Sequence, residues 1–231
     1  MKWVMVLSVA GLLGLSLPAS AQQGVAGIDT VDLRAYLGTL ELEARLDADF
    51  TGDGQADVVY VAADRNERVL GILDGAPGSA RIGARELGEG RLTVSPRSSV
   101  SLRLENDQLV VDQVVDESGV TVINYRFRYD HAAREAHLIE LTAEQYSADV
   151  TQGTTRLHWN LDTGEYTTMH GEAVTLDSGQ DVYVYGPESR TARPSAPVSL
   201  GRMPDPLVLL DGELKRHMVA ASVREGGSAT P

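Results

Sequence analysis

The sequence predicts a mainly β fold: an antiparallel β-meander or sheet built of hairpins, with one short N-terminal helix. Apolar and polar residues alternate with a period of two along most of the chain, the pattern of strands that bury one face. Turn signals such as Asn106-Asp107 and Thr163-Gly164 separate these segments. Helical periodicity is scarce, and its best example runs only from Asp29 to Leu37.

The first 21 residues predict a cleavable signal peptide. Lys2 precedes an apolar run from Trp3 to Leu17, and Ala19-Ser20-Ala21 supplies a small-residue cleavage site that would leave Gln22 first. The alternative is a membrane anchor, but the run is shorter than the roughly 20 apolar residues that span a bilayer. We therefore expect a periplasmic or secreted protein.

Composition excludes several function classes. The chain has no cysteine, which excludes disulfides, thiol catalysis, thiolate metal sites and a lipoprotein anchor. The formal net charge is −13, with a sequence pI of about 4.7. This field repels nucleic acids and anionic membranes, so we expect no nucleic-acid partner. After the predicted signal peptide no stretch is long and apolar enough to cross a bilayer, so we expect no membrane span. A protein or glycan partner remains compatible with the charge.

The predicted strands follow one another through residues 22–186, which we expect to form one β domain. Leu40, Leu42, Ala44 and Leu46 alternate with charged residues, so this first strand should bury one face. Polar residues 64–67 join the next two strands as a hairpin. The further predicted strands are 57–63, 69–73, 99–104, 109–115, 120–129, 136–141, 155–159, 165–170 and 181–185.

Residues 187–231 are predicted to be a Pro-rich extension and a disordered tail. Five of the nine prolines fall between Pro187 and Pro206, so the compact domain is expected to end near Gly186. Within the extension, Leu207 to Leu210 is a candidate for a last short strand. From Arg224 onward the chain is polar and glycine-rich, and we expect it to be disordered.

The segment from Asp49 to Asp57 has the most specific chemistry in the chain. Oxygen-bearing side chains at loop positions 1, 3, 5 and 9, with glycine at position 6, form the alternation by which a loop wraps Ca²⁺. The predicted ligands are Asp49, Thr51, Asp53, the Gln55 carbonyl and Asp57. Tyr60 occupies position 12, where an EF-hand needs glutamate. The alternative interpretation is an acidic turn, since Asp and Gly favour turns for backbone reasons alone.

The strand-loop-strand context over residues 47–61 resembles the FG-GAP or VCBS repeat, whose loop binds calcium. Thr51 departs from that signature, where Asn or Asp is usual. Only one copy of the loop is present, so a full propeller is not expected. Over residues 46–175, Tyr125-Arg126-Phe127-Arg128-Tyr129 and Asn160-Leu161-Asp162-Thr163-Gly164 also resemble uncharacterised secreted bacterial proteins with one such loop. This resemblance implies a fold and an export route, but no catalytic residues.

Two other constellations invite functional interpretations. Tyr125, Phe127 and Tyr129 share one strand face, as either a buried core row or a ligand-binding row. The histidines could bind a metal, but none has the usual metal-ligand spacing. These are His131, His137, His158 and His170.

The favoured hypothesis is an exported, non-enzymatic binding or structural module that contains a calcium-type loop. The alternative is a secreted hydrolase acting on an extracellular polymer. A hydrolase needs converging carboxylates or histidines in a concave site, whereas a binding module needs only an accessible complementary surface.

Overall fold

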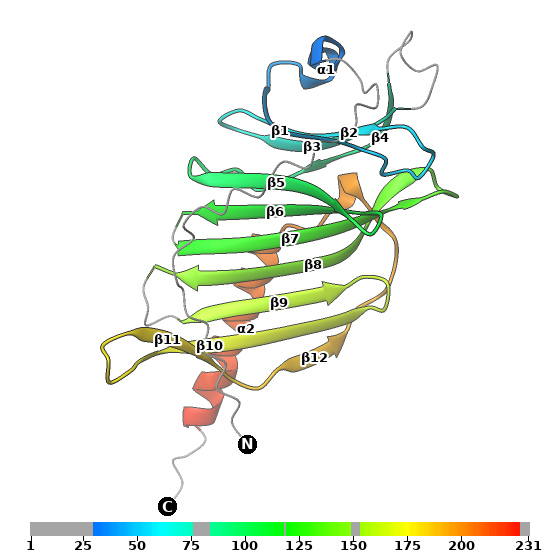
Figure 1. Ribbon diagram of the computed structural model, residues 1–231. Helices are drawn as coiled ribbons and strands as arrows, with labels where there is room; N and C mark the ends of the chain where they lie inside the picture. Colours follow the sequence, from blue (N-terminus) through cyan, green and yellow to red (C-terminus); the bar gives the residue numbers. More distant parts are fainter. Residues whose placement is uncertain (1–29, 76–83, 118, 149–152, 227–231) are drawn as a thin grey trace, which may run out of the picture.

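The computed structural model describes residues 30–75, 84–117, 119–148 and 153–226 (Figure 1). The predicted signal peptide lies outside this part of the chain. The mainly β prediction is confirmed, because the described strands form two antiparallel sheets with the orders β1-β2-β3-β4 and β11-β10-β9-β8-β7-β6-β5. These strands close into no propeller, and every strand predicted between residues 40 and 185 is present.

The four-stranded sheet is buried on both faces at its centre. Its strands are β1 (Glu41–Ala48), β2 (Asp57–Ala63), β3 (Arg68–Asp74) and β4 (Arg85–Arg91). The predicted short helix is present as α1 (Thr30–Leu37), and its Leu33 packs on one face against Tyr60. On the other face, Val59 and Ile72 belong to the main core. Both faces of β2 and β3 are therefore apolar.

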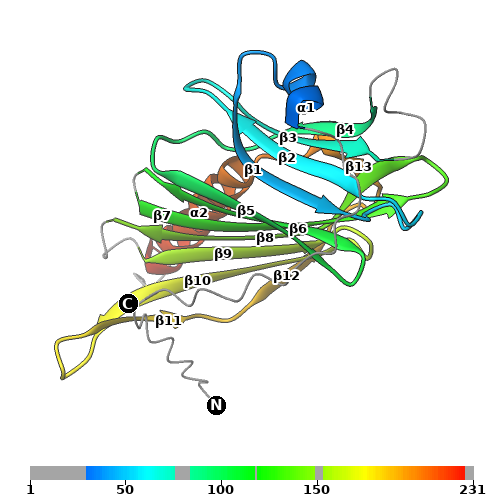
Figure 2. The ribbon, with the colours of Figure 1, turned by 45° about the horizontal axis from the view of Figure 1, so that its top comes forward.

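The larger sheet is a meander of long hairpins. Its strands are β5 (Ser98–Glu105), β6 (Gln108–Asp116), β7 (Gly119–Asp130), β8 (Glu135–Ser147), β9 (Thr154–Asn160), β10 (Glu165–Thr175) and β11 (Asp181–Tyr185). Two short strands extend it: β12 (Ser189–Ala192) pairs with β10, and β13 (Val198–Ser199) pairs with β8. The four-stranded sheet lies beside β5 (Figure 2).

The two faces of the larger sheet differ in composition. Tyr125 and Phe127 are 1% and 0% exposed and belong to the main core, so the core interpretation of the aromatic row is confirmed for these two residues. Arg126 and Arg128 alternate with them and lie on the opposite face. That second face is turned toward the viewer in Figure 1, with helix α2 (Pro206–Gly226) behind the sheet.

The expectation of one continuous buried face on β1 is wrong. The pairing of β1 with β2 shifts register between Leu42 and Ala44, which moves the apolar side chains after the bulge to the other face. Leu42 is 39% exposed, whereas Leu46 packs against the main core. The buried Arg68 donates to Glu43 at 2.7 Å and so fixes the bulged segment against β3.

The C-terminal segment also differs from its prediction. Leu207 to Leu210, predicted as a strand, begins helix α2, and the helix continues through Arg224 to Gly226, where a disordered tail was expected. Asp205 Oδ1 accepts the Leu207 amide at 2.9 Å, and Pro206 suits the first helical position because it has no amide to satisfy. Leu210 is fully buried in the main core.

Residues before α2 also reach the main core. The 3-10 helix η3 (Leu200–Arg202) carries Leu200, which is 1% exposed, so the chain beyond Gly186 contributes to the same core as the β strands. In the described part of the chain, no helix is long and apolar enough to cross a membrane.

Candidate functional site

The Asp-Gly loop lies between β1 and β2 and is closed by its own carboxylates. Asp49 Oδ1 accepts the amides of Gly52 and Asp53 at 2.7 and 3.0 Å, and its Oδ2 accepts the Gly54 amide at 2.9 Å. The positive φ angles of Gly52 and Gly54, 76° and 85°, permit this tight path. Asp53 Oδ1 accepts the Gln55 amide at 2.8 Å. The predicted turn therefore forms, with its carboxylates directed at the backbone.

Asp57 is the fully buried member of the loop. Its Oδ2 accepts the amides of Phe50 and Thr51 at 2.9 and 2.8 Å, and its Oδ1 accepts the Gly75 amide at 3.0 Å. Burial raises the pKa of Asp57, and these amide hydrogen bonds oppose that rise. The side chain thus joins the loop to the chain that follows β3.

The predicted calcium ligands lie in one loop, but their carboxylates do not converge. Among the described residues, no group of three or more acidic or histidine side chains is placed to hold a metal ion. Asp47, which precedes the loop in β1, forms an ion pair with Arg45 at 2.7 Å. The loop as placed does not fit a calcium shell, which needs about 6–8 oxygens around one point.

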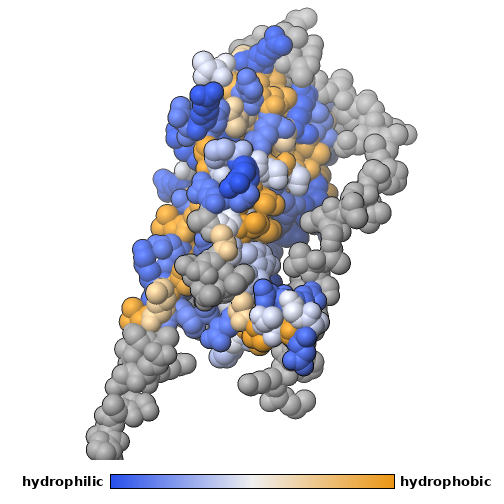
Figure 3. Space-filling model, turned by 90° about the vertical axis from the view of Figure 1, so that its left-hand side faces the viewer, coloured by the Kyte–Doolittle hydropathy of each residue, from blue (hydrophilic) through white to orange (hydrophobic). Residues whose placement is uncertain are grey.

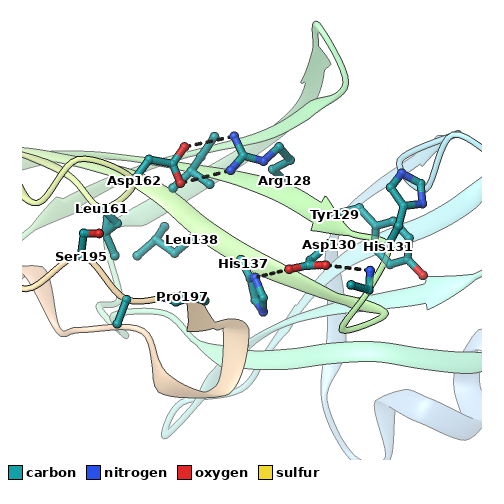
Figure 4. Close-up of a pocket in the computed structure, with 13 residues that line it drawn as sticks. Arg128, Tyr129, Asp130, His131, His137, Leu138, Leu161, Asp162, Ser195 and Pro197 are labelled. Carbon is teal, nitrogen blue, oxygen red and sulfur yellow. Dashed lines mark hydrogen bonds and ion pairs between the residues drawn. The ribbon is translucent and has the colours of Figure 1, made fainter.

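A cavity of about 590 Å³ lies at the β7–β8 hairpin end of the larger sheet (Figure 4). Three segments distant in sequence surround it: residues 128–132 with 137–139, residues 161–162, and residues 195–197. Leu138, Leu161 and Pro197 are among its apolar lining residues, and its charged lining residues are Arg128, Asp130 and Asp162. A volume of 300–1,000 Å³ with mixed lining is typical of small-ligand sites.

His137 lies at this cavity between two carboxylates. Its Nε2 is 2.9 Å from Glu135 Oε1, and its Nδ1 is 3.5 Å from Asp130 Oδ2. The amides of Ala133 and Ala132, with His137 nearby, hold the pKa of Asp130 below its usual range. Nε2 of His137 is therefore hydrogen-bonded to Glu135, and Nδ1 lies beside the Asp130 carboxylate.

Arg128 and Asp162 form the second charged pair of the cavity. Nη1 and Nη2 of Arg128 donate to the two Asp162 oxygens at 3.0 and 3.1 Å, and each side chain is about half exposed. Figure 4 shows this pair across the cavity from Asp130 and His137. Sequence reasoning noticed Arg128 and His137 separately, but it had no signal for their proximity to Asp162.

The face of the larger sheet that carries Arg128 is polar over most of its width. Arg126 lies 3.3 Å from Glu105 and 3.6 Å from Glu140, and Glu140 also contacts His158 Nε2 at 2.9 Å. Toward the other end, Arg156 and the Tyr185 hydroxyl both donate to Glu144. Figure 1 shows no described element in front of this face, which we call the open face. Figure 3, a view from the side, shows hydrophilic and hydrophobic areas interleaved.

The four histidines considered as metal ligands are separated in the structure. His131 packs edge-on against Tyr129 at 5.0 Å between ring centroids, and His158 pairs with Glu140 on the open face. His170 lies on the opposite face, where its ring stacks on His217 of α2 at 3.9 Å. These three histidines and His137 therefore lie in four different environments. In the described part of the chain they form no shared metal site.

The fold and the cavity define a class: a two-sheet antiparallel β protein with one helix-covered face, one open polar face and a cavity at its end. Comparisons with protein-family models, curated proteins and solved structures give no match.

Proposed function

We propose that the chain is an exported, non-enzymatic binding protein of the periplasm or extracellular space. Its ligand contacts the cavity bounded by Arg128, Asp162, Asp130 and His137 at the end of the open face. The observation that supports this site is the cavity itself, in which apolar walls adjoin charged groups that can orient a ligand.

Both ring nitrogens of His137 already contact carboxylates, which favours a binding function over hydrolysis. A general base must have a free nitrogen or oxygen within reach of the proton it removes. His137 faces carboxylates with both nitrogens, while His158 pairs with a different carboxylate, Glu140. His137 and His158 therefore do not converge on one site. His131, which is exposed at the rim, is the remaining histidine to test.

The ligand class that we propose is a neutral glycan or a peptide segment. The net charge of −13 disfavours anionic polymers, and the lining combines two acidic side chains with one arginine. Half-exposed charged pairs such as Arg128 with Asp162 can exchange partners with a ligand at low energetic cost, because exposed ion pairs contribute only about 0–1 kcal/mol.

An NMR titration tests this proposal. Defined neutral oligosaccharides and short peptides are added to the ¹⁵N-labelled chain without its first 21 residues. We expect shifts concentrated in the amides of residues 128–139, 161–162 and 195–196, and we expect Arg128→Ala to weaken them. Shifts elsewhere on the surface, or none with any probe, would contradict the proposed site.

A parallel assay addresses the hydrolase alternative. The same oligosaccharides and peptides are incubated with the protein, and cleavage products are measured by mass spectrometry. We expect none. Cleavage that His131→Ala or His137→Gln abolishes would replace the binding proposal with an enzymatic one.

A further inference from the structure

We propose that the Asp-Gly loop at residues 49–57 is a metal-independent clamp, in which Asp57 holds the loop to the end of β3 without bound calcium. The loop adjoins the cavity where Phe50 contacts Tyr129, but this inference does not depend on the proposed function.

The clamp rests on one carboxylate and three amides. Asp57 is 0% exposed, and its two oxygens accept from Phe50, Thr51 and Gly75 at 2.8–3.0 Å. Gly75 lies 18 residues away in sequence, so this side chain joins two separate segments. These three amides take up three of the roughly four acceptor positions of an ionised carboxylate, so Asp57 has at most one position left for a cation.

The loop and the segment after β3 approach each other so closely at Gly75 that a side chain would not fit there. A Cβ atom at this position would collide with the carbonyl oxygen of Ala56, the residue before Asp57. Only glycine leaves the space for its own amide to reach Asp57 Oδ1. The segment after β3 is therefore shaped around the carboxylate.

The remaining acidic side chains of the loop have separate partners. Asp49 accepts three amides of the turn, from Gly52, Asp53 and Gly54, while Asp53 accepts the Gln55 amide. Because each carboxylate is directed to different backbone donors, none needs a cation to offset its neighbours. Burial of Phe50, which is 2% exposed and contacts the ring of Tyr129, anchors the loop further.

One side chain of the loop favours the calcium alternative. Thr51 Oγ1, at the third ligand position, is buried and lacks a well-formed hydrogen bond, although the Thr51 side chain helps to lower the pKa of Asp57 against the effect of burial. A cation could complete the contacts of this hydroxyl. A single neutral hydroxyl is a weak contribution to a shell of about 6–8 oxygens, whereas Asn or Asp at this position would supply a stronger ligand. The three amide hydrogen bonds of Asp57 therefore argue more strongly against bound calcium than the Thr51 hydroxyl argues for it.

Calcium dependence and two matched substitutions test the clamp. Thermal unfolding of the chain is measured in 2 mM CaCl₂ and in EDTA. A ligand that binds only the folded state raises its stability, so calcium binding would appear as a higher Tm. We expect the same Tm in both solutions, and no heat of calcium binding by calorimetry.

The substitution pair is Asp57→Asn and Asp53→Asn, the same chemical change at a buried and an exposed position of one loop. An asparagine at position 57 has one acceptor oxygen and would turn an NH₂ group toward an amide donor, so we expect Tm to fall by about 5–10 °C. Asp53→Asn should lower it by less than about 2 °C. Calcium should rescue neither variant.

A calcium-induced rise of several degrees that Asp53→Asn removes would overturn the proposal, as would a neutral Asp57→Asn. If Asp57→Asn does not fold, the loop's need for that carboxylate is established, and the calcium titration of the unaltered chain decides the metal question. Neither result bears on ligand binding at the cavity, so the two proposals can fail separately.

Discussion

The two faces of the nine-stranded sheet are made by the same strands, yet they differ in what they contact. On the covered face, Phe127 and Leu157 pack into the main core. On the open face, their neighbours Arg126 and His158 pair with Glu140. Burial of apolar area stabilises a fold far more than exposed ion pairs do. The comparison indicates that the covered face maintains the fold, while the open face can change with little loss of stability and is available for binding.

The largest expected difference between the faces is at two adjacent residues of β7. Phe127→Ala should lower the free energy of unfolding by about 3–5 kcal/mol, because it leaves a cavity in the core. Arg126→Ala, on the open face, should lower it by less than about 1 kcal/mol. Urea unfolding measures both. Equal losses would show that the open face is also part of the stabilising structure.

Helix α2 provides the second comparison, because it covers the sheet on the core side. Leu210→Ala should destabilise the protein by about 2–5 kcal/mol, since Leu210 is fully buried. Val208→Ala is the control in the same helix, at a side chain that is 67% exposed, and its effect should be within about 0.5 kcal/mol. A neutral Leu210→Ala would mean that α2 does not dock on the sheet in solution.

Two tyrosine-carboxylate pairs compare the faces at the level of one hydrogen bond. Tyr166, on the covered face, donates to Glu213 of α2 at 2.6 Å, while the Tyr185 hydroxyl donates to Glu144 on the open face. Glu213 and Glu144 are similarly buried, but Tyr166 is itself only 3% exposed, whereas Tyr185 is partly exposed. Tyr166→Phe should therefore lower the free energy of unfolding by about 1–2 kcal/mol. Tyr185→Phe should have a smaller effect. The reverse order in chemical denaturation would contradict the assignment of the faces.

The smallest expected effect is a pH dependence on the covered face. Burial lowers the pKa of His170, and His217 adds to the decrease, while Glu172 opposes it. A histidine whose pKa falls on folding stays neutral in the native state. Its contribution to the stability of the fold is therefore fully present above the unfolded pKa of about 6.5 and decreases at lower pH. The decrease in Tm from pH 8 to pH 5 should be smaller in His217→Ala than in the unaltered chain. His131→Ala should leave that decrease nearly unchanged.

The strands could be predicted from sequence because one-sided burial imposes a period of two. The same reasoning failed at β1, where a bulge between Leu42 and Ala44 reverses the alternation. It also failed at α2, because prolines and Gly212 obscured the helix. The Asp205-Pro206 capping signal was present in the sequence and could have revealed the start of that helix.

The candidate sites were predictable to different degrees. The Asp-Gly turn was found from spacing, but the direction of each carboxylate depends on partners such as Gly75, which sequence spacing in the loop does not include. The cavity joins Arg128, His137, Asp162 and Ser195 from separate segments. No local pattern encodes that proximity, because it arises from strand register and from the path of the chain before β13.

The most direct test of the central claim, that the end of the open face binds a ligand, uses the absence of cysteine from the chain. Single-cysteine variants Ser195→Cys, at the cavity, and Ser189→Cys, exposed on β12 outside it, are labelled with the same environment-sensitive fluorophore. Titration with the oligosaccharide or peptide that gives the largest NMR shifts should change the fluorescence at position 195 in a saturable manner and leave position 189 unchanged. Equal responses at both positions, or a response only at position 189, would contradict the account.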